Sequence, residues 1–395
     1  MKAERITVLG STGSIGRSTL DVIRRNPSRF RVFALGAGSN VDQMLTDCLE
    51  FVPDFAVLSD GDAARVLAGK LALQDSPVKV LSGYEQLSRI ASHEQCDAVM
   101  AAIVGSAGLV PALAAVEAGK KIYLANKESL VMTGHLFIRA MKEHQAVILP
   151  VDSEHNAIFQ SLPETEQRRI GLCELHSSGV DKLLLTGSGG PFRTMPLDEL
   201  KNVTPEQAVS HPTWNMGRKI SVDSSTMMNK GFEFIEAKWL FNLDNDSIDV
   251  VVHPQSVIHS MVQYSDGSVI AQLGNPDMRT PIARAMAYPD RISSGVSHLD
   301  FFKLGSMTFE EPDFRRYPCL KLAIDACWSG QAATTALNAA NEIAVQAFLD
   351  ERTGYMDIYR LCSEAVEHFA AHSIVDVLSV LELDRQVRTY VQALI

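Results

Sequence analysis

Several features that mark large classes of protein are missing from this chain of 395 residues. Its six cysteines are widely scattered and form no Cys-x-x-Cys pair, so neither a disulfide framework nor a thiolate metal site is indicated. No apolar run reaches the ~20 residues that span a bilayer, and the first apolar segment, residues 6–9, begins too early to follow a signal peptide. The formal net charge is -11 and no long run of lysines and arginines occurs, which disfavours nucleic acid as a partner. We therefore expect a soluble cytoplasmic protein with no membrane partner, its cysteines being buried or idle thiols.

The length predicts two or three domains with substantial hydrophobic cores. Apolar, strand-like segments alternate with helix-like segments over the first 150 residues, a pattern that predicts an α/β fold with a doubly wound parallel sheet. The predicted strands are residues 6–9, 31–35, 55–58, 78–81, 98–102, 122–125 and 146–151. The alternation then becomes irregular, although the runs 257–262 and 269–272 around an Asp-Gly pair predict a hairpin. After residue 317 the apolar spacing is helical to the end, which predicts a small helical bundle.

The first predicted strand runs into a Gly-x-x-Gly-x-x-Gly turn formed by Gly10, Gly13 and Gly16. Glycines permit a tight turn with close backbone approach, and the helix that follows offers free amides to a pyrophosphate. A plain structural turn is the alternative reading of a glycine triplet. Its place between a strand and a helix favours nucleotide binding.

The second predicted strand ends in residues 36–40, where no acidic residue occurs. An NAD site usually has an Asp or Glu there to hold the ribose hydroxyls. Small and amide side chains leave space for a 2′-phosphate, so the sequence favours NADP over NAD. The alternative is a loop chosen only for turning.

Asp152 and Glu154 follow the apolar run 146–151. If the segment is extended, both carboxylates point to the same side of a strand end and repel each other. A shared proton, a basic partner or a hard divalent cation would neutralise them. The simpler alternative is a strand end whose Asp caps the next helix.

A second polar cluster begins with Ser224, Asn229 and Lys230, a hydroxyl, amide and ammonium set typical of phosphate binding. Glu233 lies three residues beyond Lys230 and is a candidate third oxygen ligand for a metal held by Asp152 and Glu154, or else an ordinary capping or surface glutamate. The glycine-rich turn 187–191 is also suited to an anion.

Two further positions carry open alternatives. Lys127 follows the predicted strand 122–125 at the edge where such folds bind ligands, and is either a ligand contact or a surface lysine. The aperiodic stretch 210–219 contains Trp214 and Met216, which indicates either a mobile lid or a loop whose Trp packs on the core.

Taken together, the motifs within residues 10–16, 124–130, 150–159, 187–192 and 227–231 resemble those of the 1-deoxy-D-xylulose 5-phosphate reductoisomerase family, along the whole chain. The resemblance implies rearrangement and NADPH-dependent reduction of that sugar phosphate to 2-C-methyl-D-erythritol 4-phosphate, in a homodimer. It also implies a Rossmann-like NADPH domain (1–150), an α/β catalytic domain (151–288) with a lid near 208–218, a linker (289–312) and a C-terminal helical domain (313–395).

The resemblance assigns roles residue by residue. The metal, Mg²⁺ or Mn²⁺ with Co²⁺ as a further option, is assigned to Asp152, Glu154 and Glu233, which with Lys127 and His211 make the catalytic set. Substrate contacts are assigned to Lys127, Ser153, Glu154, Ser188, His211, Trp214, Ser224, Asn229, Lys230 and Glu233. Cofactor contacts are assigned to Thr12, Gly13, Ser14, Ile15, Gly38, Ser39, Asn40, Asn126, Glu128, Met216 and Gly217. Members of the family often carry a basic residue where Ser39 stands, so a cation facing the 2′-phosphate is missing here.

Two other classes of function remain open on the sequence. One is a metal-independent NADP dehydrogenase of another phosphorylated aldehyde or an amino acid derivative, with Asp152 and Glu154 only capping a helix. The other is a non-catalytic nucleotide sensor that uses the same glycine-rich turn. The second phosphate-type cluster and the third carboxylate count against a sensor.

Overall fold

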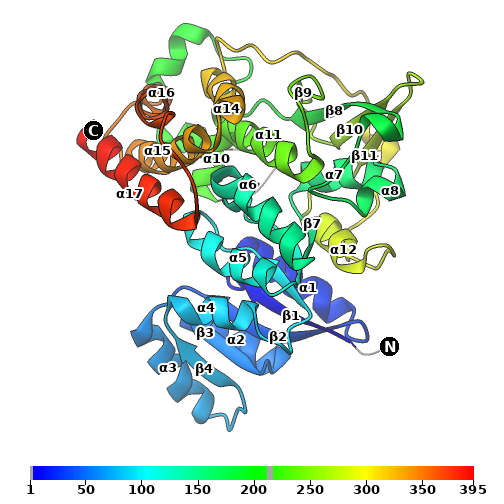
Figure 1. The fold of residues 1–395 in the computed structure, drawn as a ribbon, viewed down its shortest axis with the longest axis vertical. Helices are drawn as coiled ribbons and strands as arrows, with labels where there is room; N and C mark the ends of the chain where they lie inside the picture. Colours follow the sequence, from blue (N-terminus) through cyan, green and yellow to red (C-terminus); the bar gives the residue numbers. More distant parts are fainter. Residues whose placement is uncertain (1–2, 211–216) are drawn as a thin grey trace. The chain divides into compact units, whose positions relative to one another are not determined.

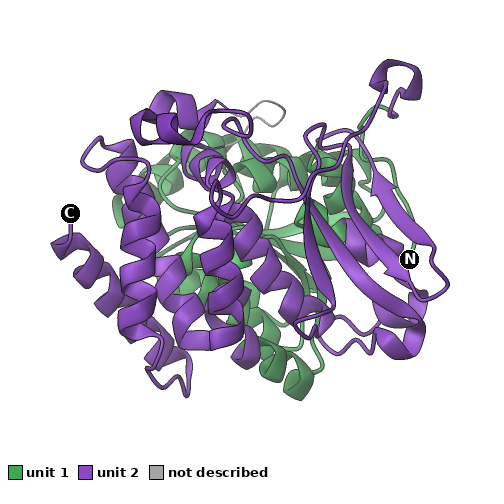
Figure 2. Cartoon of the chain, turned by 90° about the horizontal axis from the view of Figure 1, so that it is seen from above, with its two compact units in different colours: residues 1–129, 137–156, 277–297 green, residues 130–136, 157–276, 298–395 purple. Residues whose placement is uncertain are grey.

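The computed structural model describes residues 3–210 and 217–395, and the chain forms two compact units. Unit 1 comprises residues 1–129, 137–156 and 277–297, and unit 2 comprises residues 130–136, 157–276 and 298–395 (Figure 2). Both units are built from segments distant in the sequence. Within the described residues, no helix is both long and apolar enough to cross a membrane.

Unit 1 contains a seven-stranded parallel sheet in the order β4-β3-β2-β1-β5-β6-β7 (Figure 1). Its strands are β1 (Glu4–Leu9), β2 (Phe30–Ala37), β3 (Phe55–Leu58), β4 (Lys79–Ser82), β5 (Ala98–Ala101), β6 (Lys121–Leu124) and β7 (Val147–Pro150). The predicted doubly wound sheet is confirmed. The strand order reverses beside β1, which pairs with both β2 and β5, and ligands of such sheets bind at the carboxyl edge near this reversal.

Helices α1 to α6 connect successive strands of unit 1, because parallel neighbours require crossover connections. They are α1 (Ser14–Arg25), α2 (Val41–Phe51), α3 (Gly61–Ala72), α4 (Tyr84–Ala91), α5 (Leu109–Glu117) and α6 (Lys127–His144), of which the two ends belong to unit 1. Unit 1 also contains α12 (Arg279–Ala287), which follows the unit 2 sheet in the chain. In α1, apolar residues such as Leu20 and Ile23 are buried, while the last turn is basic and Asn26 and Pro27 follow it. Amphipathic spacing therefore produces the packed face, as the sequence predicts.

Unit 2 contains a four-stranded mixed sheet in the order β11-β10-β8-β9. Its strands are β8 (Val180–Gly187), β9 (Ile248–Val252), β10 (Ile258–Tyr264) and β11 (Val269–Leu273). The predicted hairpin is confirmed: β10 and β11 are antiparallel, and Gly267 in their connection has a φ of +86°. β11 is an edge strand of this sheet.

Short helices and a C-terminal helical group complete unit 2. The helices are most of α7 (Ser153–Ser161), α8 (Glu164–Gln167), α9 (Pro205–Val209), α10 (Arg218–Ser225), α11 (Met228–Phe241), α13 (Phe301–Leu304), α14 (Pro318–Ser329), α15 (Gln331–Leu349), α16 (Asp357–Phe369) and α17 (Val377–Ala393). The four C-terminal helices confirm the predicted helical region. Helix α13 was not predicted: it is a single turn capped by Asp300 within the stretch expected to be a linker.

The glycine turn after β1 predicts a sharp difference between two Gly→Ala variants. At Gly10 the φ is +78° and an added Cβ would lie 2.4 Å from the Ala102 carbonyl oxygen. We expect Gly10→Ala to lower the free energy of unfolding by ~2 kcal/mol or more, because the backbone is strained and two main chains must separate. Gly69→Ala, within α3 and with no atom within 4 Å of the added carbon, is the control.

Gly69→Ala should raise the free energy of unfolding by up to about 1 kcal/mol, because alanine favours the helix. Urea denaturation of both variants measures the difference. A Gly10→Ala protein as stable as the unmodified chain would contradict the close approach at this turn.

Candidate functional site

The glycine turn at the carboxyl end of β1 leaves a helix N-terminus open. Gly13 is the residue before α1, its position carries no side-chain cap, and the first turn of α1 contains no acidic residue. An added Cβ on Gly16 would lie 2.3 Å from the Gly10 carbonyl oxygen, so the helix begins directly against the turn. The neighbouring predicted contacts Thr12, Ser14 and Ile15 are exposed or partly exposed. Amides and the helix dipole here suit an anion such as a pyrophosphate.

The end of β2 brings further predicted cofactor residues to the same edge, because β1 and β2 are parallel neighbours. Gly38, Ser39 and Asn40 directly follow β2 and are all exposed. Asn40 also caps α2, since its side chain accepts a hydrogen bond from the Gln43 amide at 3.2 Å. No carboxylate occupies this loop, as the sequence shows.

Asn126 organises the end of β6. Its side-chain oxygen accepts from the Ser129 amide at 2.9 Å and caps α6, while its amide nitrogen donates to the Ile103 carbonyl at 2.5 Å. The same nitrogen lies 3.1 Å from a carboxylate oxygen of Glu128. Both Asn126 and Glu128 are buried. These two predicted cofactor residues therefore hold a rigid strand-to-helix turn at the carboxyl edge.

The expected extended conformation around Asp152 is wrong. β7 ends at Pro150 and α7 begins at Ser153, so Glu154 stands in the first helical turn. The cause is local hydrogen bonding: the Glu154 amide donates to Asp152 Oδ1 at 3.2 Å. The helix-capping alternative is correct in this respect, although capping leaves the second carboxylate oxygen for another partner.

That second oxygen of Asp152 faces a cation. Lys127 Nζ lies 2.9 Å from Asp152 Oδ2, and both side chains are nearly buried. Lys127 is therefore not the surface lysine that was the alternative. His155, a neighbour not predicted from the sequence, is fully buried with Nδ1 3.5 Å from Asp152 Oδ1. The helical spacing of three residues could have indicated it. Beside them, the Ser153 hydroxyl donates to Glu154 Oε2 at 2.5 Å.

In unit 2 the glycine-rich turn after β8 packs closely against two predicted substrate residues. Gly190 has a φ of +67°, and an added Cβ there would lie 2.8 Å from the Ser224 carbonyl oxygen. An added Cβ on Gly187 would lie 2.9 Å from Lys230 Cε. The Gly190 amide donates to the Ser188 hydroxyl at 3.1 Å. Ser188, Ser224 and Lys230 are thus brought together from three elements.

Glu233 is buried and held by the residues of its own helix. Asn229 Nδ2 donates to Glu233 Oε1 at 2.5 Å, and Lys230 Nζ forms an ion pair with Oε2. Glu233 is 1% exposed and Lys230 is 5% exposed. The surface-glutamate alternative is therefore wrong. A buried carboxylate whose oxygens face an amide and an ammonium is a candidate oxygen ligand for a hard cation.

Some predicted site residues cannot be placed. His211, Trp214 and Met216 lie outside the described residues, so the lid stays a prediction. Gly217 is described: it is exposed and immediately precedes α10. Asp152 and Glu154 belong to unit 1 and Glu233 belongs to unit 2.

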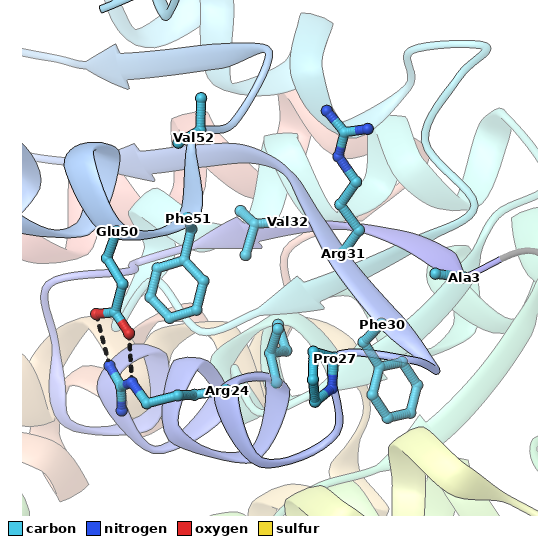
Figure 3. Close-up of a pocket in the computed structure, with 10 residues that line it drawn as sticks. Ala3, Arg24, Pro27, Phe30, Arg31, Val32, Glu50, Phe51 and Val52 are labelled. Atoms are coloured by element: carbon cyan, nitrogen blue, oxygen red, sulfur yellow. Dashed lines mark hydrogen bonds and ion pairs between the residues drawn. The ribbon is translucent and has the colours of Figure 1, made fainter.

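Unit 1 has a cavity of about 550 Å³ (Figure 3). Its lining includes Ala3, which precedes β1, and Phe30, which begins β2, so it lies at the amino edge of the sheet. Arg24 and Glu50 form an ion pair beside apolar side chains there. The cavity contains none of the predicted site residues and is on the wrong edge for nucleotide binding.

The cysteines play no part in the candidate site. All six are free and buried, as predicted from the sequence. Burial raises the pKa of Cys48 and Cys173 to about 12, so their thiols remain protonated near neutral pH.

Three segments along the chain match models of the same protein family. Residues 6–134 match the family model described as 1-deoxy-D-xylulose 5-phosphate reductoisomerase, residues 148–241 match the model of its C-terminal domain, and residues 273–390 match the model described as DXP reductoisomerase C-terminal domain. A curated 1-deoxy-D-xylulose 5-phosphate reductoisomerase of Haemophilus influenzae (strain 86-028NP) is 58% identical over 395 residues, covering 100% of both chains. The enzyme of that name from Tolumonas auensis is 59% identical over 383 residues, 97% of this chain and 96% of the relative.

Two solved structures agree with the fold. A DOX-P reductoisomerase in complex with NADPH, fosmidomycin and magnesium has a TM-score of 0.95 at 48% identity, covering 99% of this chain and 98% of that chain. The 1-deoxy-D-xylulose 5-phosphate reductoisomerase from Zymomonas mobilis, in complex with NADPH, has a TM-score of 0.91 at 45% identity and covers 99% of each chain.

Proposed function

The chain belongs to the 1-deoxy-D-xylulose 5-phosphate reductoisomerase family, and from this we propose how its own residues serve the family's reaction. The protein is an NADP-dependent oxidoreductase with an isomerase step. It converts 1-deoxy-D-xylulose 5-phosphate to 2-C-methyl-D-erythritol 4-phosphate, with NADPH and Mg²⁺ as cofactors, in non-mevalonate isoprenoid biosynthesis.

We assign the divalent cation to Asp152, Glu154 and Glu233. The observation that carries this assignment is the burial of Glu233, a carboxylate that is only 1% exposed. Three carboxylates are the oxygen ligands that Mg²⁺ prefers, and Mn²⁺ or Co²⁺ would fit the same set. Bound there, the cation polarises a ketone oxygen and a neighbouring hydroxyl for rearrangement of the carbon skeleton. Lys127 pairs with Asp152 and fixes the position of its Oδ2.

The phosphate of the substrate is assigned to Ser188, Ser224, Asn229 and Lys230. This assignment is supported by the packing of the turn after β8 against Ser224 and Lys230. A hydroxyl pair, an amide and an ammonium supply charge-assisted hydrogen bonds to phosphate oxygens. The other substrate contacts are assigned to Lys127 and Ser153 in unit 1. The family positions His211 and Trp214 are assigned to the substrate as well.

NADPH is assigned to the carboxyl edge of the unit 1 sheet. The uncapped start of α1 supports a pyrophosphate contact at residues 12–15. The exposed, uncharged residues 38–40 leave room for the 2′-phosphate. Asn126, Glu128, Met216 and Gly217 complete the set. When bound, NADPH supplies the hydride for reduction of the rearranged aldehyde.

The finer organisation is also proposed from the family. Functionally, we assign NADPH binding to residues 1–150, metal and substrate binding to 151–288 with a lid near 208–218, a linker to 289–312 and a helical domain to 313–395. The cytoplasm is the proposed compartment.

A homodimer is the proposed assembly, with β11 in the interface. Val269 and Ile270 on this edge strand are each about half exposed, and the strand carries no charged residue. Phe302 in α13 is fully exposed. Edge strands are normally protected by charges or bulges, and a two-fold axis lets an edge strand pair with its own copy. These features support a second copy of this chain as the occupant.

The metal assignment predicts the behaviour of Glu233→Gln. The variant keeps the shape but removes a charge and a strong ligand, so turnover at low Mg²⁺ should fall by about two orders of magnitude or more. Part of it should return as Mg²⁺ or Mn²⁺ is raised, while NADPH affinity stays nearly unchanged. Steady-state turnover against metal concentration is the measurement, with exposed Glu206→Gln on α9 as the control. Normal turnover of Glu233→Gln at low metal would refute the shared cation.

The loop after β2 predicts a preference for NADPH over NADH that Ser39 limits. Ser39→Lys should widen the ratio of catalytic efficiencies roughly fivefold, the effect of one exposed charge pair, and salt should reduce the gain. Ser39→Gln is the control, because it adds length without charge. If the lysine and glutamine variants gave the same ratio, Ser39 would not face the 2′-phosphate.

The dimer proposal predicts that Ile270→Lys lowers the dimer's stability, because a charge would be placed on the edge strand. Size-exclusion chromatography with light scattering should show a larger monomer fraction on dilution. Val66→Lys in α3, also half exposed, is the control and should leave assembly unchanged. A variant that dimerises as tightly as the unmodified chain would remove β11 from the interface.

A further inference from the structure

A buried carboxylate that the reaction does not use stands beside the proposed phosphate site. Asp223 lies on α10, one residue before Ser224, and is 2% exposed. Lys219 Nζ lies 2.7 Å from Asp223 Oδ2, one helical turn earlier on the same helix. A carboxylate and an ammonium buried together need each other and their hydrogen-bond partners in place, because a lost partner leaves a buried polar group without compensation.

The other oxygen of Asp223 is held from the C-terminal helical group. Asn341 on α15 is fully buried, and its Nδ2 donates to Asp223 Oδ1 at 2.8 Å. Helices α10 and α15 are in contact along this face. Lys219 in turn lies 5.4 Å from the ring centroid of Phe232 on α11. A hydrogen bond therefore links α10 to α15, and a cation–π contact links α10 to α11.

The position of α10 determines the geometry of the residues that follow it. α10 ends at Ser225, and Met227, with a φ of +56°, turns the chain directly into α11. Asn229 and Lys230 are in the first turn of α11. Because α11 is also packed against α14, a shift of α10 alone would move Ser224 relative to Asn229 and Lys230.

We propose that Asn341 is a positioning residue for the phosphate group of the substrate. Through Asp223 it holds α10 where Ser224, Asn229 and Lys230 converge on one anion. Asn341 does not itself contact the ligand, and its role rests on the assignment of the phosphate to Ser224 and its neighbours.

The test compares Asn341→Ala with Asn338→Ala in the full-length enzyme. Asn338 lies one turn earlier on α15, is equally buried, and donates to Glu342 Oε1 at 3.4 Å rather than to α10. Inorganic phosphate serves as the probe, as a competitive inhibitor of turnover of the sugar phosphate. We expect Asn341→Ala to raise the inhibition constant of phosphate and the KM of the sugar phosphate about five- to tenfold, less than the full effect of one hydrogen bond to a charged group because Asn341 acts through Asp223. The Kd of NADPH should not change.

Asn338→Ala should reduce thermal stability similarly but leave the inhibition constant of phosphate within about twofold of the unmodified enzyme, because its hydrogen bond does not reach α10. Equal inhibition constants for the two variants would overturn the proposal, because Asn341 would then contribute only to packing. If Asn341→Ala does not fold, Asn341→Leu provides the same test: it keeps about the same volume, has no donor for Asp223 Oδ1 and should weaken phosphate inhibition.

Ser224→Ala separates the two levels of inference. If phosphate inhibits the Ser224→Ala enzyme more weakly but inhibits the Asn341→Ala enzyme normally, only the positioning role of Asn341 is overturned. Unchanged inhibition in Ser224→Ala would overturn the phosphate assignment on which that role depends.

Discussion

A carboxylate removed from water must face a cation or several hydrogen-bond donors, and this constraint shapes both units. Glu233 and Asp223 are 1% and 2% exposed, and each has a lysine from its own helix against it. Asp152 is paired with Lys127 from the start of α6. The uncompensated charge would cost several kcal/mol in each case. The helix starts and turns that bring each lysine to its carboxylate are therefore as much a part of the site as the carboxylates.

Strand-to-helix turns supply the remaining order in unit 1. β1, β2 and β6 are parallel, so their carboxyl ends meet at one edge, and each leads into a helix whose start carries predicted ligand residues. Two of these helices begin at an asparagine cap, whereas α1 begins at Gly13 with no side-chain cap. The helix start that lacks its own cap is the one suited to an external anion. At this edge, the side-chain caps stabilise the starts of α2 and α6, and the start of α1 is left for the ligand.

Predictions from the sequence were correct where local pattern decides the outcome. The seven strands, the β10–β11 hairpin and the C-terminal helices follow from apolar periodicity and turn residues. The prediction was wrong at Asp152, where two carboxylates two residues apart suggested an extended segment. A side-chain hydrogen bond from the Glu154 amide to Asp152 starts a helix there instead, and periodicity over so few residues cannot distinguish the two.

From the sequence alone, the glycine turn, the absence of an acid after the second strand and the three candidate carboxylates could be identified, because each is a property of residue type and short spacing. Burial could not be read in this way. Glu233 has the spacing of a surface glutamate, yet the packing of unit 2 encloses it with Lys230. The bond between Asn341 and Asp223 joins residues 118 positions apart, and no local signal marks either side chain. Only tertiary structure decided these partners, since the energy of a charge depends on which groups surround it in space.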